Sequence, residues 1–158
     1  MRLLIIGHIG SGKTTLANKI SAGCGVPVYD LANLAFEVKE GTRRRRSKRE
    51  MLKVLAKIDH AGSWIIEGEP HKSYDFLYGW ADRILLMEPA VDVRRKRILK
   101  RFAHSKFGHG RGEGSPTLLS LGKELYKNQR AESKSSKRKL AKSLQPYAAK
   151  ITRVVPKK

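Results

Sequence analysis

The sequence predicts an α/β protein in which a central parallel sheet carries helices on both faces. Short apolar runs, each about as long as a buried strand, alternate along the 158 residues with longer segments whose apolar residues recur at helical spacing. The first of these runs leads directly into a glycine-rich stretch that opens a helix. Strands and helices that alternate in this way build parallel sheets, and a chain of this length is expected to form one domain, residues 1–158.

The glycine-rich stretch, GHIGSGKT, fits the pattern G-x-x-x-x-G-K-[ST] of a phosphate-binding loop at every fixed position. Glycines let the backbone wrap around a phosphate with its N–H groups turned inward, and the helix N-terminus adds positive potential. We expect Lys13 to reach the β- and γ-phosphates and the Thr14 hydroxyl to ligate Mg²⁺. Thr15 either helps to hold the α-phosphate or simply continues the helix. The residues expected to bind the nucleotide are Gly7, His8, Ile9, Gly10, Ser11, Gly12, Lys13, Thr14 and Thr15.

The first strand is expected at residues 2–6, the first helix at 13–22 and a short second strand at 26–29. Asp30 follows that second strand. Ligands of open α/β sheets bind at the carboxyl ends of the strands, so Asp30 is placed to orient an acceptor, to act as a base or to hold a metal-bound water. It is equally suited to cap a helix at residues 31–37, and the sequence leaves both roles open.

The next segment combines a basic run with a helix. The four arginines at positions 43–46 either bind phosphates of an acceptor or form a solvated basic loop. Ser47 then caps a helix at residues 48–60, with Glu50 at the third helical position, as a capping box requires.

A third strand, residues 64–67, is apolar until Glu67. An acidic residue at the end of an inner strand beside a phosphate loop has the Walker B arrangement, which holds Mg²⁺. Glu67 is therefore the candidate metal residue beside Thr14, and Glu69 is an alternative. The fourth strand is expected at residues 83–87.

The last part of the chain begins with a basic helix at residues 91–103. The glycine-rich segment 104–116 has no periodicity and is predicted to be a lid that closes over bound nucleotide. A long helix at 117–144 and a fifth strand at 150–155 complete the order. We expect Arg97, Arg101 and Arg111 to contact the transferring phosphoryl group. The other catalytic candidates are Lys13 and Asp30.

Charge and composition indicate which classes of partner this protein can bind. The formal net charge is +20, and residues 89–158 hold 20 of the 34 basic residues against 4 of the 14 acidic ones. Such a field attracts polyanions, so nucleic acid is an open partner for the basic C-terminal half. There is no apolar run long enough to span a membrane, and the single cysteine, Cys24, is expected to be a packing residue. We expect a cytoplasmic protein.

Three stretches carry a family resemblance: LLIIGHIGSGKTTLA near the N-terminus, PVYDL at 27–31 and WIIEG at 64–68, with ADRILLMEP at the matching distance. They are similar to the bacterial DNA topology modulation proteins, which are P-loop kinases related to adenylate and shikimate kinases. The resemblance implies a three-layer P-loop nucleoside triphosphate hydrolase fold, a five-stranded parallel sheet in the order 2-3-1-4-5, and a site for ATP and Mg²⁺.

The sequence departs from these relatives where the acceptor would bind. Ala32 replaces an aspartate, Glu67 replaces the aspartate of a D-G-N motif, and His71 stands where adenylate kinases have an arginine. We expect a kinase that transfers the γ-phosphoryl group of ATP to a nucleotide, a nucleoside or a similar small acceptor. The alternatives are a polynucleotide 5′-end kinase and an ATP-binding regulatory protein associated with nucleic acid.

Overall fold

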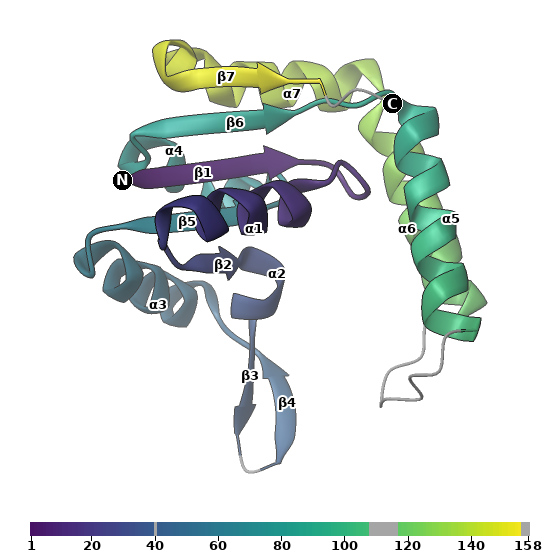
Figure 1. Ribbon diagram of the computed structural model, residues 1–158, viewed down its shortest axis with the longest axis horizontal. Coiled ribbons are helices and arrows are strands. Elements are labelled where there is room, and N and C mark those ends of the chain that lie inside the picture. The colour runs from purple at the N-terminus through teal and green to yellow at the C-terminus, as the bar shows by residue number, and fades with distance from the viewer. Residues whose placement is uncertain (40, 108–116, 156–158) are drawn as a thin grey trace.

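The computed structural model describes residues 1–39, 41–107 and 117–155 (Figure 1). Its five-stranded sheet has the order β2-β5-β1-β6-β7, and every pairing is parallel. This confirms the expected strand order. The strands are β1 (Arg2–Gly7), β2 (Val28–Asp30), β5 (Trp64–Gly68), β6 (Arg83–Met87) and β7 (Ile151–Val154).

Helices cover both faces of the sheet, which confirms the three-layer architecture. Helix α1 packs on one face, and helices α3, α4 and α7 pack on the other. Helices α5 and α6 lie side by side beyond the carboxyl ends of the strands (Figure 1). The helices are α1 (Lys13–Cys24), α2 (Leu31–Leu34), α3 (Lys48–His60), α4 (Phe76–Trp80), α5 (Val91–Phe107), α6 (Leu118–Ala131) and α7 (Lys134–Leu144), with 3-10 turns η1 (Lys72–Tyr74) and η2 (Gln145–Lys150).

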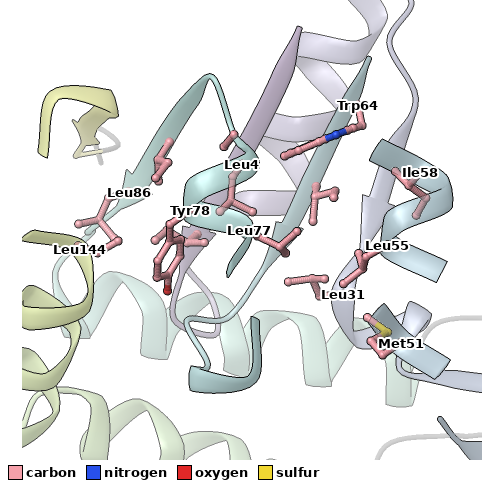
Figure 2. Close-up of a cluster of buried hydrophobic side chains, with 14 residues drawn as sticks. Leu4, Leu31, Met51, Leu55, Ile58, Trp64, Leu77, Tyr78, Leu86 and Leu144 are labelled. Carbon is pink, nitrogen blue, oxygen red and sulfur yellow. The ribbon is translucent and has the colours of Figure 1, made fainter. Parts of the chain in front are cut away.

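The strands of the sheet centre are buried on both faces, because helices lie above and below them. In β1, Leu4 and Ile6 belong to the larger core cluster, whose members Leu77 and Leu144 come from α4 and α7 (Figure 2). Leu3 and Ile5 point to the other face and pack with α1. Alternation along each strand therefore decides which helix a side chain meets.

Helix α3 matches its predicted bounds. Ser47 Oγ accepts a hydrogen bond from the Glu50 N–H at 3.3 Å, and Glu50 Oε2 accepts one from the Ser47 N–H at 2.7 Å, so the capping box is confirmed. Together with Arg44, these bonds hold the pKa of Glu50 at about 2. The apolar stripe of the helix enters the core through Met51, Leu55 and Ile58.

The helix predicted at residues 31–37 is confirmed only over its first four residues. Helix α2 ends at Leu34, and two short strands follow, β3 (Phe36–Lys39) and β4 (Thr42–Arg45), which pair antiparallel as a hairpin. Gly41 in the turn has φ 76°, a conformation that glycine adopts without steric cost. The residues of β3 and β4 are largely exposed, so these strands have no continuous apolar face from which the sequence could have predicted them.

The last third of the chain also differs from expectation. Residues 104–107, predicted to begin the lid, are the last turn of α5, and residues 108–116 lie outside the described part. The long helix expected at 117–144 is two helices, because Ser133 interrupts it and caps α7 by accepting the Ser136 N–H. Cys24 is exposed rather than packed.

Within the described residues, no helix is both long and apolar enough to cross a membrane.

The core contribution of α3 is testable at two leucines of the same helix. Leu55 is fully buried and Leu52 is 45% exposed. Leu55→Ala should lower the free energy of unfolding by about 2–5 kcal/mol, because truncation leaves a cavity. Leu52→Ala should change it by about 0.5 kcal/mol. Urea denaturation followed by circular dichroism measures both, and equal losses would contradict the packing of α3 on the sheet.

Candidate functional site

The phosphate loop connects β1 to α1 and is in close contact with two other elements. At Gly7, a Cβ would lie 2.8 Å from the carbonyl oxygen of Met87 in β6. At Gly10, it would lie 2.7 Å from the carbonyl oxygen of Arg94 in α5. Gly10 and Gly12 have φ of 75° and 93°, where a side chain is strained. The glycines are therefore required by backbone packing as well as by the shape of the loop.

Thr14 and Glu67 are brought together by strand alternation. Ile65 of β5 packs on the α1 face of the sheet and Ile66 packs on the opposite face, so Glu67 returns to the side of α1. Thr14 Oγ1, in the first turn of α1, donates a hydrogen bond to Glu67 Oε1 at 2.5 Å. The two residues predicted to serve the metal are thus direct neighbours.

Glu67 is a buried carboxyl group, 3% exposed. Burial raises its pKa above the usual value, while the Thr14 hydrogen bond and the charge of Lys13 act in the opposite direction. The carboxyl group therefore holds its proton to higher pH than an exposed glutamate, and a cation bound beside it would favour ionisation.

The Lys13 side chain lies along the loop that precedes it. Its Nζ donates a hydrogen bond to the carbonyl oxygen of His8 at 3.2 Å. Burial lowers the pKa of Lys13, and Glu67, Glu69 and Asp30 partly offset that effect. The ammonium group is thus desolvated but surrounded by acidic residues.

A cleft of about 1010 Å³ opens beside the loop at the carboxyl edge of the sheet. One side is formed by α2, β3 and β4, and the other by α5 and α6, which stand apart in Figure 1. Lys13, Thr14, Thr15, Asp30 and Glu67 all line it. The cleft therefore collects side chains from five segments that are distant in sequence.

Asp30 both caps a helix and lines the cleft, the two positions that the sequence left open. Its Oδ1 accepts a hydrogen bond from the Ala32 N–H at 2.7 Å, so it caps α2. It also lines the cleft, in register with Glu67 on the neighbouring strand β5. A carboxylate can accept more hydrogen bonds than the one used for the cap.

Two of the three arginines predicted near the phosphoryl group line the cleft. Arg97 Nη1 donates to the carbonyl oxygen of Ser11 at 3.0 Å, so this side chain contacts the phosphate loop directly. Arg101 Nη2 donates to Glu124 Oε2 of α6 at 2.6 Å. The third, Arg111, lies outside the described residues.

Arg94 was not singled out from the sequence. Its side chain is buried and forms an ion pair with Glu132, and Lys137 Nζ lies 2.7 Å from the same carboxylate. Buried Asn128 donates to the Val91 carbonyl oxygen at 3.4 Å. These contacts join α5 to α6 and α7. Helix α5 holds seven Lys and Arg residues, and its sequence gives no signal that distinguishes the buried Arg94 from the others.

Three of the predicted nucleotide-binding residues, Gly7, His8 and Ser11, do not line the cleft. Gly7 and His8 line a second cavity of about 550 Å³ between β6, α5 and α7. Burial and the charge of Arg94 lower the pKa of His8, which favours the neutral imidazole. Ser11 is fully buried, and among the described residues its Oγ has no hydrogen-bond partner.

The residues present fit a magnesium site of the P-loop kind. Mg²⁺ keeps several waters and takes one or two protein oxygens together with substrate phosphates. The Thr14 hydroxyl and the Glu67 carboxylate offer these two oxygens at the edge of the cleft. The described residues contain no group of three or more His, Cys, Asp or Glu side chains that could enclose a metal by themselves.

Comparison with solved structures identifies the fold as that of the P-loop kinases. Shikimate kinase from Aquifex aeolicus matches with a TM-score of 0.51 at 15% identity, over 100% of this chain and 87% of that one. Shikimate kinase from Acinetobacter baumannii in complex with shikimate matches with a TM-score of 0.52 at 13% identity, over 99% and 83%. No family model and no curated protein matches the chain. The resemblance to the DNA topology modulation proteins therefore stays a prediction.

The contact between the phosphate loop and α5 can be tested with two glycines of similar φ. Gly10 and Gly25 have φ of 75° and 71°, so alanine suffers similar backbone strain at both, about 1–2 kcal/mol. At Gly25, no described atom lies within 4 Å of the added Cβ. We expect Gly10→Ala to lower the free energy of unfolding by a further 1–3 kcal/mol or so, because it collides with the Arg94 backbone. Equal losses in chemical denaturation would contradict this contact.

Proposed function

We propose that the protein is a phosphotransferase that moves the γ-phosphoryl group of ATP to a small acceptor. The observation that carries this proposal is the hydrogen bond between Thr14 and Glu67, which aligns the end of the phosphate loop with the carboxyl end of β5 beside an open cleft. The P-loop kinase fold supports the same conclusion.

The chain supplies positioning and charge for this reaction. The N–H groups of the phosphate loop and the N-terminus of α1 hold the phosphates, and Lys13 neutralises the β- and γ-phosphates. Thr14 and Glu67 hold Mg²⁺, which supplies positive charge to the same phosphates when bound. Arg97 holds the loop through the Ser11 carbonyl, and both Arg97 and Arg101 line the cleft from α5.

Asp30 is the residue proposed to receive the proton. An acceptor hydroxyl oxygen attacks the γ-phosphorus, and the bond from phosphorus to the bridging β,γ-oxygen breaks. ADP leaves, the hydroxyl proton passes to the Asp30 carboxylate, and from there it passes to solvent. The backbone N–H of Ala32 holds this carboxylate in place at the edge of the cleft.

The nucleic-acid alternatives rest on charge alone. Helix α7 carries five basic residues and no acidic residue, so it suits contact with phosphates. A polynucleotide acceptor and a regulatory role stay predictions, as does Arg111 near the phosphoryl group.

Lys13→Ala tests the nucleotide site. Removal of the ammonium group should abolish at least about nine tenths of the stabilisation by ATP and Mg²⁺, because the phosphates lose their main point charge. Thermal unfolding at increasing ATP concentration measures this effect. Lys19→Ala is the matched control, since Lys19 is an exposed lysine of the same helix. An unchanged ATP response in Lys13→Ala would refute the site.

Glu67→Gln tests whether Glu67 holds Mg²⁺. Glutamine keeps the size of the side chain and can accept the Thr14 hydrogen bond, but it removes the charge. The increase in ATP affinity on addition of Mg²⁺ should fall about tenfold or more, while affinity for ATP without metal stays the same or rises. Glu88→Gln is the control, because Glu88 also follows a strand at this edge and is exposed. Titration calorimetry with and without Mg²⁺ measures the ATP affinity of both variants. An equal effect of Mg²⁺ on the ATP affinity of Glu67→Gln and Glu88→Gln would contradict the assignment of Glu67 to the metal.

A further inference from the structure

The two ends of the cleft differ in chemistry. The phosphate loop, Arg97 and Arg101 form the nucleotide end. The opposite end, which we call the acceptor end, is formed by α2, the β3–β4 hairpin and the segment after β5. Its lining side chains with polar or aromatic groups are Asp30, Phe36, Arg45, Glu69, His71 and Tyr74.

Two of the four hairpin arginines are engaged in holding the hairpin to α2 and α3. Arg44 pairs with Glu37 across the hairpin and with Glu50 at the start of α3. Arg46 donates to the Leu34 carbonyl oxygen at 2.7 Å and lies 3.4 Å from the Glu37 carboxylate. Their charges are compensated within the described fold, and neither residue lines the cleft.

The other two arginines lie on the opposite face of the hairpin, because side chains alternate along a strand. Arg43 places its guanidinium over the Phe36 ring, 4.4 Å from the ring centroid. Arg45 pairs with Phe36 in the strand register and lines the cleft. Among the described residues, Arg45 is therefore the one hairpin arginine that faces an acceptor.

Acidic groups outnumber this single arginine. Asp30 and Glu67 are register partners on neighbouring strands, and Glu69 follows two residues after Glu67. All three are close enough to raise the pKa of Lys13, against the effect of its burial. Glu67 is assigned to the metal, so a second anionic group at the acceptor end would meet Asp30 and Glu69 against Arg45 as the one arginine in the lining of that end. A hydroxyl group, by contrast, can donate to these carboxylates.

From this arrangement we propose that the acceptor is an uncharged molecule with at least two hydroxyl groups, of the nucleoside or sugar class, and that the acceptor end discriminates against phosphomonoesters and carboxylates. The inference rests on the proposed phosphoryl transfer. Asp30 receives the reacting hydroxyl, and Glu69 accepts a hydrogen bond from another.

The rings at this end suit the flat face of such a molecule. The His71 and Tyr74 rings lie 5.8 Å apart with an interplanar angle of 48°, and Phe36 lines the cleft from the hairpin side. Aromatic rings pack against bases and against the apolar faces of sugars alike. The chemistry shared by nucleosides and sugars is therefore a ring that bears hydroxyl groups, and the experiment separates the two.

The test uses matched pairs that differ by one anionic group. The full-length protein with ATP and Mg²⁺ is offered the four ribonucleosides against their 5′-monophosphates, ribose against ribose 5-phosphate, and glucose against glucose 6-phosphate and against glucuronate, which keeps the sugar ring. Transfer of label from γ-labelled ATP gives kcat/KM for each. We expect the uncharged member of at least one pair to be preferred by tenfold or more. Preference for the anionic members, or transfer to no member of either series, overturns the inference.

Charge substitution at Glu69 provides a second readout. Glu69→Arg should shift the preference within the best pair toward the phosphorylated member by at least tenfold, and Glu69→Gln should shift it less in the same direction. Glu88→Arg, which makes the same change outside the cleft, should leave the preference unaltered. If Glu69→Arg and Glu88→Arg act alike, the acceptor end does not select by charge and the inference fails.

ATP-dependent thermal stabilisation of the same preparation separates this inference from the proposed function. If wild-type protein is not stabilised by ATP and Mg²⁺, the phosphotransferase proposal itself fails. If ATP stabilises the protein and label passes to monophosphates, the proposed function stands and the choice of acceptor is wrong.

Discussion

The close approach of the phosphate loop to β6 and α5 is the constraint on which the rest of the site depends. Gly7 leaves no room for a Cβ beside Met87, and Gly10 leaves none beside the Arg94 carbonyl. Because the loop touches the first turns of α5, Arg97 reaches the loop carbonyls. Arg94 then ties α5 to Glu132 at the end of α6. The wall of the cleft that α5 and α6 form is therefore fixed relative to the phosphate loop by backbone packing and by the ion pair of the buried Arg94 with the half-buried Glu132.

Local pairing, rather than net charge, determines the electrostatics of the cleft. The chain carries a formal charge of +20, which by itself predicts electrostatic attraction for any anion. Yet Arg44 and Arg46 of the hairpin are neutralised by Glu37 and Glu50, Arg43 lies over a ring, and only Arg45 lines the cleft among the described hairpin arginines. The carboxyl ends of β2 and β5 bring acidic residues into the same space. A strongly basic protein can therefore contain an acidic subsite, because only side chains that face the ligand act on it without screening.

The sequence was sufficient where structure is determined locally. The phosphate loop is a contiguous motif, and Glu67 ends an apolar run whose alternation already places it on the α1 face. The β3–β4 hairpin was missed although FEVK alternates before the Gly41 turn, because its exposed residues form no apolar stripe. The roles of Arg44, Arg46 and Arg94 depend on glutamates elsewhere in the chain. A sequence that offers many arginines and few acids does not say which of them will pair.

The hydrogen bonds at the phosphate loop explain how charged groups remain stable in a partly buried site. Burial lowers the pKa of Lys13 and raises the pKa of Glu67, so it favours the neutral form of each group. Each has a substitute partner within the chain: the His8 carbonyl for the ammonium group and the Thr14 hydroxyl for the carboxyl group. A bound triphosphate with its divalent cation offers both groups stronger, fully charged partners. The free energy released by exchanging the weaker partners for these stronger ones is available for nucleotide binding, so the site is arranged around a ligand that is both anionic and metal-bearing.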